Sequence, residues 1–226
     1  MSIIIAVDGT AASGKGTLAK QLAAHYGFAH LDSGALYRLT ALAVLQAKGD
    51  PGREADALRG ARAIDLSMAG DPAIRTDVVG QAASKVAGSG AVRAGLLDFQ
   101  KDFLSHPPGG SPGAVMDGRD IGTVIAPDAA AKLYVDARPE LRAHRRWLEL
   151  KSMGIDRDEA DLLKELMARD AADKSRPISP LKPAPDAALL DTSDLGIEPA
   201  FAAALAMVEP KVRPHLEGLL KDRHRG

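Results

Sequence analysis

A chain of 226 residues, of which 46% are hydrophobic and 26% charged, has the composition of a globular protein and excludes extensive disorder. This length favours one domain with insertions, because single cores stop growing at roughly 250–300 residues. The formal net charge of −1 disfavours a nucleic-acid polymer as partner, since proteins that follow a phosphate backbone carry a strong basic excess. The absence of cysteine excludes a disulfide framework, a thiolate zinc site and a cysteine nucleophile.

The sequence shows no targeting or membrane segment. Its longest apolar runs, 3–7 and 200–208, are far shorter than the ~18 residues of a membrane span. The first run leads directly into a glycine-rich stretch, unlike a signal peptide. We therefore expect a cytoplasmic protein without a membrane partner, and a monomer, because nothing in the sequence requires a second subunit.

Short apolar runs alternate with helical patterns along the chain. Residues 3–7 are uninterrupted and largely β-branched, which is typical of a strand buried on both faces. Further strands are predicted over 28–31, 114–116, 131–135 and 187–191, and helices over 14–26, 34–47, 138–153, 158–172 and 197–208. Residues 53–105 carry helical patterns and no convincing strand, and the basic tail 211–226 is expected to be a solvated helix. This alternation predicts an α/β fold, a five-stranded parallel sheet flanked by helices.

The strongest motif directly follows the first strand. It comprises Gly9, Thr10, Ala11, Ala12, Ser13, Gly14, Lys15, Gly16 and Thr17. The two outer glycines let the backbone turn with its N–H groups facing inward, and these groups, with the N-terminus of the next helix, cradle phosphate oxygens. The lysine then reaches the β- and γ-phosphates. Chance glycines in a strand–turn–helix are the alternative, but the position between a buried strand and an amphipathic helix is what ATP binding requires.

Gly16 departs from the commonest form of this loop, in which a Ser or Thr after the lysine binds Mg²⁺. The Gly-Lys-Gly-Thr form is typical of nucleoside monophosphate kinases. It implies that Mg²⁺ arrives with ATP and is held by nucleotide phosphates and water, so no metal-binding residue is predicted.

Three later blocks carry a resemblance to a known family. Asp32–Arg38 reads DSGALYR, Asp117–Thr123 reads DGRDIGT, and Arg169, Asp173 and Arg176 follow in that order. With the glycine loop, these blocks resemble bacterial cytidylate kinases over nearly the whole chain, to about residue 205. The resemblance implies a P-loop NTPase fold in one nucleoside monophosphate kinase domain, 1–226, with an acceptor-binding excursion over about 33–106 and a short lid over about 170–183. It also implies ATP-dependent phosphorylation of CMP and dCMP.

The residue types suit that reaction on chemical grounds. Phosphoryl transfer between two nucleotides gathers several negative charges, and the protein must align the donor and acceptor and neutralise the moving group. Arginine binds phosphate oxygens bidentately and never loses its charge. A lone arginine is usually a solvated surface side chain, but four arginines embedded in matching motifs point to phosphate binding.

The resemblance implies particular roles. Residues expected to act on the transferring phosphoryl group are Lys15, Arg119, Arg169 and Arg176. The acceptor nucleotide is expected to be bound by Ser33, Arg38, Ser84, Arg93, Asp117, Arg119, Asp120, Arg169, Asp173 and Arg176. Among these, Ser84, Arg93 and Asp120 would read the base, because cytosine offers an amino donor beside two acceptors and uracil would leave the carboxylate unpaired.

A basic stretch in the predicted helix 138–153 has two interpretations. Arg145 could contact the donor phosphates, as a helix arginine near this position does in related kinases. Arg142, Arg145 and Arg146 could instead form a basic face that pairs with Glu140 and Glu149.

Two acidic residues at strand ends also leave alternatives open. Asp8 could orient Lys15 or a hydrated Mg²⁺, or it could cap the turn. Asp117 lies where P-loop proteins often place an acid near the metal. The six histidines show no metal-ligand spacing and are interpreted as non-ligands.

The chain departs from the family pattern in two segments. Many bacterial members have a strand-rich insert before the base-reading serine, but residues 65–76 leave no room for several strands. In the lid, Ala171, Ala172, Lys174 and Ser175 stand where relatives often place extra arginines, which lowers the positive charge of the lid.

Two other functions compete with this reading. One is a P-loop kinase acting on UMP, AMP or a phosphate-free metabolite, and the other is a protein that binds nucleotide only as a regulator. The arginines expected to hold an acceptor phosphate disfavour a phosphate-free acceptor and the regulator.

Overall fold

The computed structural model describes residues 2–223 and divides the chain into two compact units. One unit contains the residues up to Leu31 and those from Leu104 onward, and the other contains Asp32–Phe103. Most of the predicted acceptor-binding excursion, 33–106, falls in the second unit. No helix within the described part of the chain is long and apolar enough to cross a membrane.

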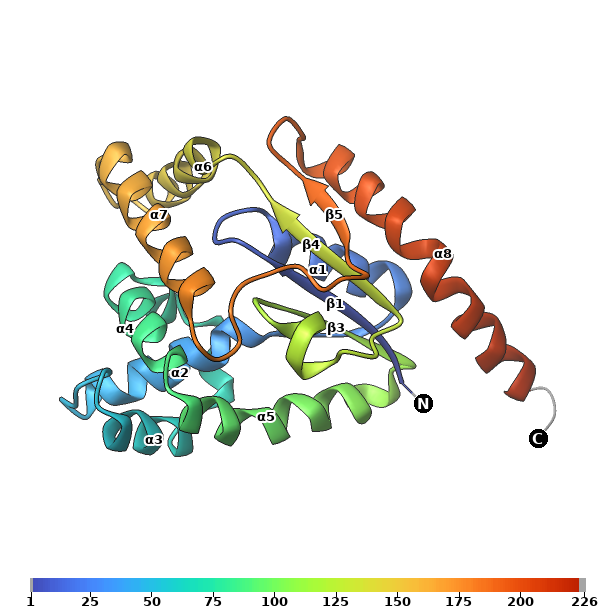
Figure 1. Cartoon of the computed structure of the whole chain (residues 1–226), viewed down its shortest axis with the longest axis horizontal. Helices are drawn as coiled ribbons and strands as arrows, with labels where there is room; N and C mark the ends of the chain where they lie inside the picture. The colour runs from blue at the N-terminus through green and yellow to red at the C-terminus, as the bar shows by residue number, and fades with distance from the viewer. Residues whose placement is uncertain (1, 224–226) are drawn as a thin grey trace. The chain divides into compact units, whose positions relative to one another are not determined.

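A five-stranded sheet forms the centre of the first unit, as the alternating pattern predicts. Its strands are β1 (Ile3–Gly9), β2 (Ala29–Asp32), β3 (Gly113–Gly118), β4 (Ala131–Asp136) and β5 (Ala188–Asp191), in the spatial order β2-β3-β1-β4-β5 (Figure 1). Strand β1 pairs in parallel with β3 and β4, and β4 pairs in parallel with β5. The carboxyl ends of the strands therefore meet at one edge, where ligands bind in open parallel sheets.

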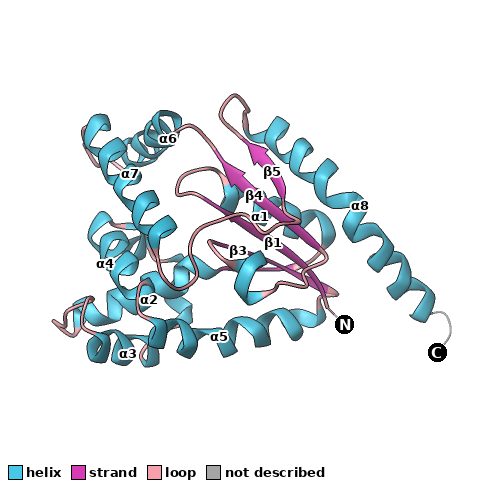
Figure 2. Ribbon diagram, viewed as in Figure 1, coloured by secondary structure: helices cyan, strands magenta, loops and turns pink. Residues whose placement is uncertain are grey.

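Two helices of the first unit bury the apolar core against this sheet. Helix α1 (Lys15–Tyr26) and helix α8 (Ile197–Arg223) pack their apolar side chains on those of β1, β3, β4 and β5. Helices α6 (Pro139–Ser152) and α7 (Glu159–Ser175) lie side by side near the carboxyl ends of the strands (Figure 2). The sequence predicts that this helix ends at residue 172, but in the structure α7 continues to Ser175. The first residues of the predicted lid, 170–175, therefore belong to α7.

The second unit is helical. It contains α2 (Ser33–Gln46), α3 (Glu54–Arg62), α4 (Asp77–Ala87) and most of α5 (Gly90–Ser105). Residues 65–76, which the sequence predicts to lack a small sheet, form two short 3-10 helices, Leu66–Gly70 and Pro72–Arg75. The side chains of Ala35, Leu39 and Ile74 bury a small core between α2 and the second of these turns.

Helix α8 is continuous where the sequence predicts one helix over 197–208 and a separate solvated helix in the tail 211–226. It continues from residue 208 to Arg223 through Pro210 and Pro214. Both prolines are exposed, so water can satisfy the carbonyls that lose their helical donors. Val212 is buried in the core, which makes the prediction of a wholly solvated tail wrong for its first part. Residues 224–226 of that predicted tail lie outside the described residues.

The packing of α8 can be tested by truncating Val212. This side chain is 0% exposed, whereas Leu220 on the same helix is 57% exposed. We expect Val212→Ala to lower the free energy of unfolding by about 2 kcal/mol, because it removes buried methyl groups and leaves a cavity. Urea denaturation should show this loss, and Leu220→Ala should change the value by less than about 0.5 kcal/mol. Equal effects of the two substitutions would contradict the packing of this helix on the sheet.

Candidate active site

The glycine loop joins β1 to α1 at the carboxyl edge of the sheet. A side chain at Gly9 would overlap the carbonyl oxygen of Val135 on the neighbouring strand β4, so only glycine fits there. Gly14 has a φ of 88° and immediately precedes the first residue of α1, Lys15. The helix N-terminus and the loop N–H groups thus lie together, as phosphate binding requires.

Side chains from two neighbouring strands brace this loop. The hydroxyl of Thr10 donates to Oδ1 of Asp136 at 2.6 Å, and the hydroxyl of Thr192 donates to the carbonyl of Ser13 at 2.8 Å. Asp136 ends β4 and Thr192 directly follows β5. The Nζ of Lys15 lies 3.4 Å from the carbonyl of Thr10. Hydrogen bonds with residues outside the loop therefore fix its conformation. The side chain of Lys15 turns back toward the loop backbone.

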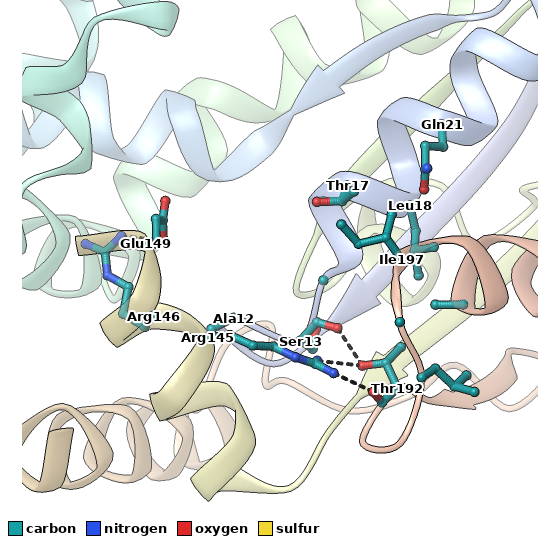
Figure 3. Close-up of a pocket in the computed structure, with 14 residues that line it drawn as sticks. Ala12, Ser13, Thr17, Leu18, Gln21, Arg145, Arg146, Glu149, Thr192 and Ile197 are labelled. Carbon is teal, nitrogen blue, oxygen red and sulfur yellow. Dashed lines mark hydrogen bonds and ion pairs between the residues drawn. The ribbon is translucent and has the colours of Figure 1, made fainter. Parts of the chain in front are cut away.

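A pocket of about 390 Å³ lies beside the loop in the first unit. Helix α1 contributes Thr17, Leu18 and Gln21 to it, and the segment after β5 contributes Ile197 (Figure 3). The guanidinium of Arg145 donates to the hydroxyl of Thr192 at 3.0 Å and to its carbonyl at 2.6 Å. A partly apolar pocket with a flat guanidinium, next to a phosphate loop, suits a nucleotide base.

The arginines of α6 do not form one basic face. Arg146 pairs with Glu149 at 2.8 Å, as one interpretation of the sequence predicts. Arg145 and Arg146 both line the pocket, and contact of Arg145 with the donor phosphates stays a prediction. Arg142 is buried and pairs with Asp170 of α7, so it does not belong to a basic face that pairs with Glu140 and Glu149.

Asp117 lies at the end of β3, close to the start of α1. Its Oδ1 is 2.9 Å from Nε2 of His30, and its Oδ2 would lie 3.6 Å from a Cβ built on Gly16. Residues 2–223 contain no cluster of three or more His, Asp or Glu side chains arranged to hold a metal ion. The carboxylate of Asp117, an oxygen donor close to the start of α1, is of a type that could orient the waters of a Mg²⁺ arriving on the nucleotide.

Asp8 caps a turn, although not the turn of the glycine loop. Its two carboxylate oxygens accept the backbone N–H groups of Ile121 and Gly122, each at 2.8 Å. These residues begin a single π-helical turn, Ile121–Ile125, that follows β3. Burial raises the pKa of Asp8 to about 6 in spite of these two hydrogen bonds. Asp8 thereby fixes the backbone directly after two predicted site residues, Arg119 and Asp120.

An arginine–carboxylate cluster lies in the same unit. Arg119 Nε donates to Oδ2 of Asp173 at 2.9 Å, and Arg176 also pairs with this carboxylate. Burial alone would raise the pKa of Asp173, but the two guanidinium groups, with a contribution from Arg169, hold it below its usual range. Two arginines that would otherwise repel one another are thus kept together by one buried carboxylate.

The remaining acceptor residues lie in the second unit. Arg93 of α5 lies 5.4 Å from the ring centroid of Tyr37 and donates to the carbonyl of Ala87. Arg38 of α2 donates to the carbonyl of Ile74, at 3.2 Å. Ser33 begins α2, and Ser84 of α4 donates to the carbonyl of Gly80. The placement of Ser84 on one helix and Arg93 on the next agrees with their spacing, and their contacts with a nucleotide stay a prediction.

Sequence reasoning missed the residues that support the loop. Asp136, Thr192 and Arg142 touch it directly, and His30 holds Asp117. A signal was present for the first two, because each lies at the carboxyl end of a predicted strand. No local pattern distinguishes Arg142 from the other arginines of its helix.

Comparisons with known proteins agree with these features. A family model described as cytidylate kinase matches residues 5–210. A cytidylate kinase of Rhodopseudomonas palustris (strain TIE-1) is 56% identical over 207 residues, covering 92% of this chain and 96% of that protein. A cytidylate kinase of Rhodospirillum rubrum is 51% identical over 209 residues, covering 92% of this chain and 98% of that protein. The crystal structure of an uncharacterized protein from Eubacterium ventriosum aligns with 92% of this chain and 99% of its own, with a TM-score of 0.53 and 13% identity, which supports the fold alone.

The buried carboxylate of Asp8 makes stability depend on pH in a defined direction. Its pKa is about 6 in the folded protein against an ordinary 3.8, so the folded state binds this proton more tightly. The resulting stabilisation is fully present below about pH 4 and is lost as the pH rises through about 6. We expect the free energy of unfolding of the wild type, relative to Asp8→Asn, to fall by about 2–3 kcal/mol between pH 4 and pH 7. Urea denaturation across this range measures it, and a difference that stays constant with pH would refute the assignment.

Proposed function

Because this chain belongs to the cytidylate kinase family, we propose that it transfers the γ-phosphoryl group of ATP to the phosphate of CMP or dCMP. The products are ADP and CDP or dCDP. The observation that carries the proposal is a braced glycine loop in the same unit as two arginines, Arg119 and Arg176, paired with the buried Asp173. A protein that binds nucleotide only as a regulator has no need of the second of these features.

The reaction requires no covalent protein intermediate. An oxygen of the CMP phosphate attacks the γ-phosphorus in line, the bond to the β-phosphate oxygen breaks, and ADP leaves with that oxygen. Mg²⁺ bound to ATP would neutralise phosphate charge, with Asp117 placed to orient its waters. The protein supplies alignment and positive charge, and it keeps water away from the γ-phosphate.

The donor nucleotide is assigned to the loop and its pocket. The loop N–H groups and the N-terminus of α1 would bind the ATP phosphates, with Lys15 moving from Thr10 onto the transferring group. The adjacent pocket, walled by Arg145 and Ile197, would take the base of ATP. An arginine face and apolar side chains hold a flat aromatic ring by stacking and burial.

The residues proposed to bind the acceptor nucleotide are those that the family resemblance implies. Arg119, Arg169 and Arg176 would bind acceptor and transferring phosphates, and Asp173 would accept hydrogen bonds from the ribose. In the second unit, Arg38 would bind the acceptor phosphate. Asp120, Arg93 and Ser84 would read cytosine. The single chain carries all of these residues, so the proposal needs no second subunit.

Acceptor specificity distinguishes the proposal from its rivals. A coupled assay of ADP release should show rapid turnover with CMP and dCMP, slower turnover with UMP and AMP, and almost none without an acceptor. Lys15→Ala should lower kcat with CMP by at least about 10³-fold with unchanged thermal unfolding, because the lysine charge acts on the transferring group. Equal rates with and without an acceptor, or faster turnover with AMP or UMP than with CMP, would overturn the proposal.

The base-reading assignment of Asp120 is tested by changing its donor–acceptor character. Its carboxylate is buried, so it is useful only if its hydrogen bonds are made. Asp120→Asn can turn its amide N–H₂ toward O4 of uracil, so kcat/KM should shift from CMP toward UMP by about 10–100-fold, equivalent to roughly 1–3 kcal/mol. The exposed Asp128→Asn is the matched control and should leave the CMP/UMP ratio unchanged. Equal losses for both substrates in Asp120→Asn would show that this carboxylate does not read the base.

A further inference from the structure

Arg142 is a buried arginine for which the proposed reaction gives no role. Its residue is 2% exposed, and its guanidinium contacts three separate segments of the first unit. Nε donates to the carbonyl of Ala137 at 2.8 Å, Nη1 donates to the carbonyl of Ala11 at 3.1 Å, and Nη2 lies 2.6 Å from Oδ2 of Asp170. One side chain thus joins the end of β4, the phosphate loop and helix α7.

The contact with the loop lies beside a strained residue. Ala12 has a φ of 58°, in the left-handed region that disfavours any residue with a Cβ. The carbonyls on both sides of it are held from outside the loop, that of Ala11 by Arg142 and that of Ser13 by Thr192. A strained backbone persists only where its surroundings fix it, and here the fixing donors are identified.

The surroundings of Asp170, the ion-pair partner of Arg142, indicate that this ion pair maintains the geometry of the loop rather than adding to the stability of the fold. Asp170 is 6% exposed, and its Oδ1 is buried with no hydrogen-bond partner among the described residues. A buried ion pair of this kind is often matched or exceeded in stability by well-packed apolar side chains. Arginine offers what apolar side chains lack, a rigid fork that reaches two carbonyls and a carboxylate at once.

We propose that Arg142 is a positioning residue that clamps the phosphate loop in its strained, phosphate-binding conformation and ties that loop to α7. Helix α7 also carries Arg169 and Asp173, one turn or less from Asp170. Arg142 therefore fixes the loop proposed to bind the ATP phosphates relative to α7, the helix that carries Arg169. Arg142 does not itself touch the nucleotide. The inference rests on the proposed function only in that this loop binds the phosphates of ATP.

The test uses a variant that removes the clamp without leaving a buried charge. Arg142→Met alone would leave the buried carboxylate of Asp170 without its ion-pair partner. The informative variant is therefore the double substitution Arg142→Met/Asp170→Leu in the full chain. The matched control is Arg157→Met/Glu165→Leu, which removes another ion pair, at 2.6 Å, between α7 and the segment before it. Calorimetry with a non-hydrolysable ATP analogue and Mg²⁺ measures binding without reference to any acceptor.

We expect the Arg142/Asp170 double variant to remain folded, with a thermal midpoint close to that of the wild type, and to bind the analogue about tenfold or more weakly. The control pair should bind it as the wild type does. Adding Ala12→Gly should reduce the loss to about threefold or less, relative to Ala12→Gly alone, because glycine adopts this conformation without strain. Rescue by glycine is not expected of a residue that contributes only to stability.

Other results would overturn the clamp. If the wild type binds the analogue and the folded double variant binds it equally, Arg142 does not position the loop. If the double variant loses as much affinity for the analogue in the Ala12→Gly background as in the wild-type background, Arg142 does not act by holding the strained conformation of Ala12. Failure of the wild type itself to bind the analogue would instead refute the proposed function.

Discussion

Strand β4 runs so close to β1 that no side chain fits at Gly9, where the glycine loop begins. The remaining arrangement follows from this constraint. Residues at the carboxyl ends of β4 and β5, Asp136 and Thr192, reach the loop because parallel strands end at the same edge. The loop proposed to bind phosphate is therefore held in place by the edge of the sheet.

Carboxylates organise the same edge in different ways. The buried Asp8 holds the turn after β3, the half-exposed Asp136 holds the loop, and the buried Asp173 pairs with Arg119 and Arg176. The two buried carboxylates are paired with donors, since an unpaired buried charge would cost several kcal/mol. In the proposed phosphoryl transfer between two polyanions, this arrangement has a second use: arginines kept close together by a carboxylate would already be in place when phosphates arrive, so less side-chain ordering would accompany binding.

Much of this arrangement could be predicted from local sequence. The β-branched run 3–7, the glycine loop and the alternation of strands with helices indicate the sheet, because each depends on neighbours in the chain. The continuity of helix α8 could not be predicted, since Pro210 lies between the two predicted helices and only the burial of Val212 against the sheet explains why the helix continues. The position of Arg142 was likewise beyond prediction, because its partners at Ala11 and Asp170 are 131 and 28 positions away in the chain.

The central claim is that this chain transfers one phosphoryl group from one nucleotide to another, and product identity tests it most directly. Phosphorus NMR of a mixture of ATP, CMP, Mg²⁺ and the protein follows every phosphate species at once. The account predicts that ADP and CDP resonances grow at equal rates while inorganic phosphate stays at its starting level. Growth of inorganic phosphate with CMP unchanged would show a nucleotide hydrolase and would contradict the account.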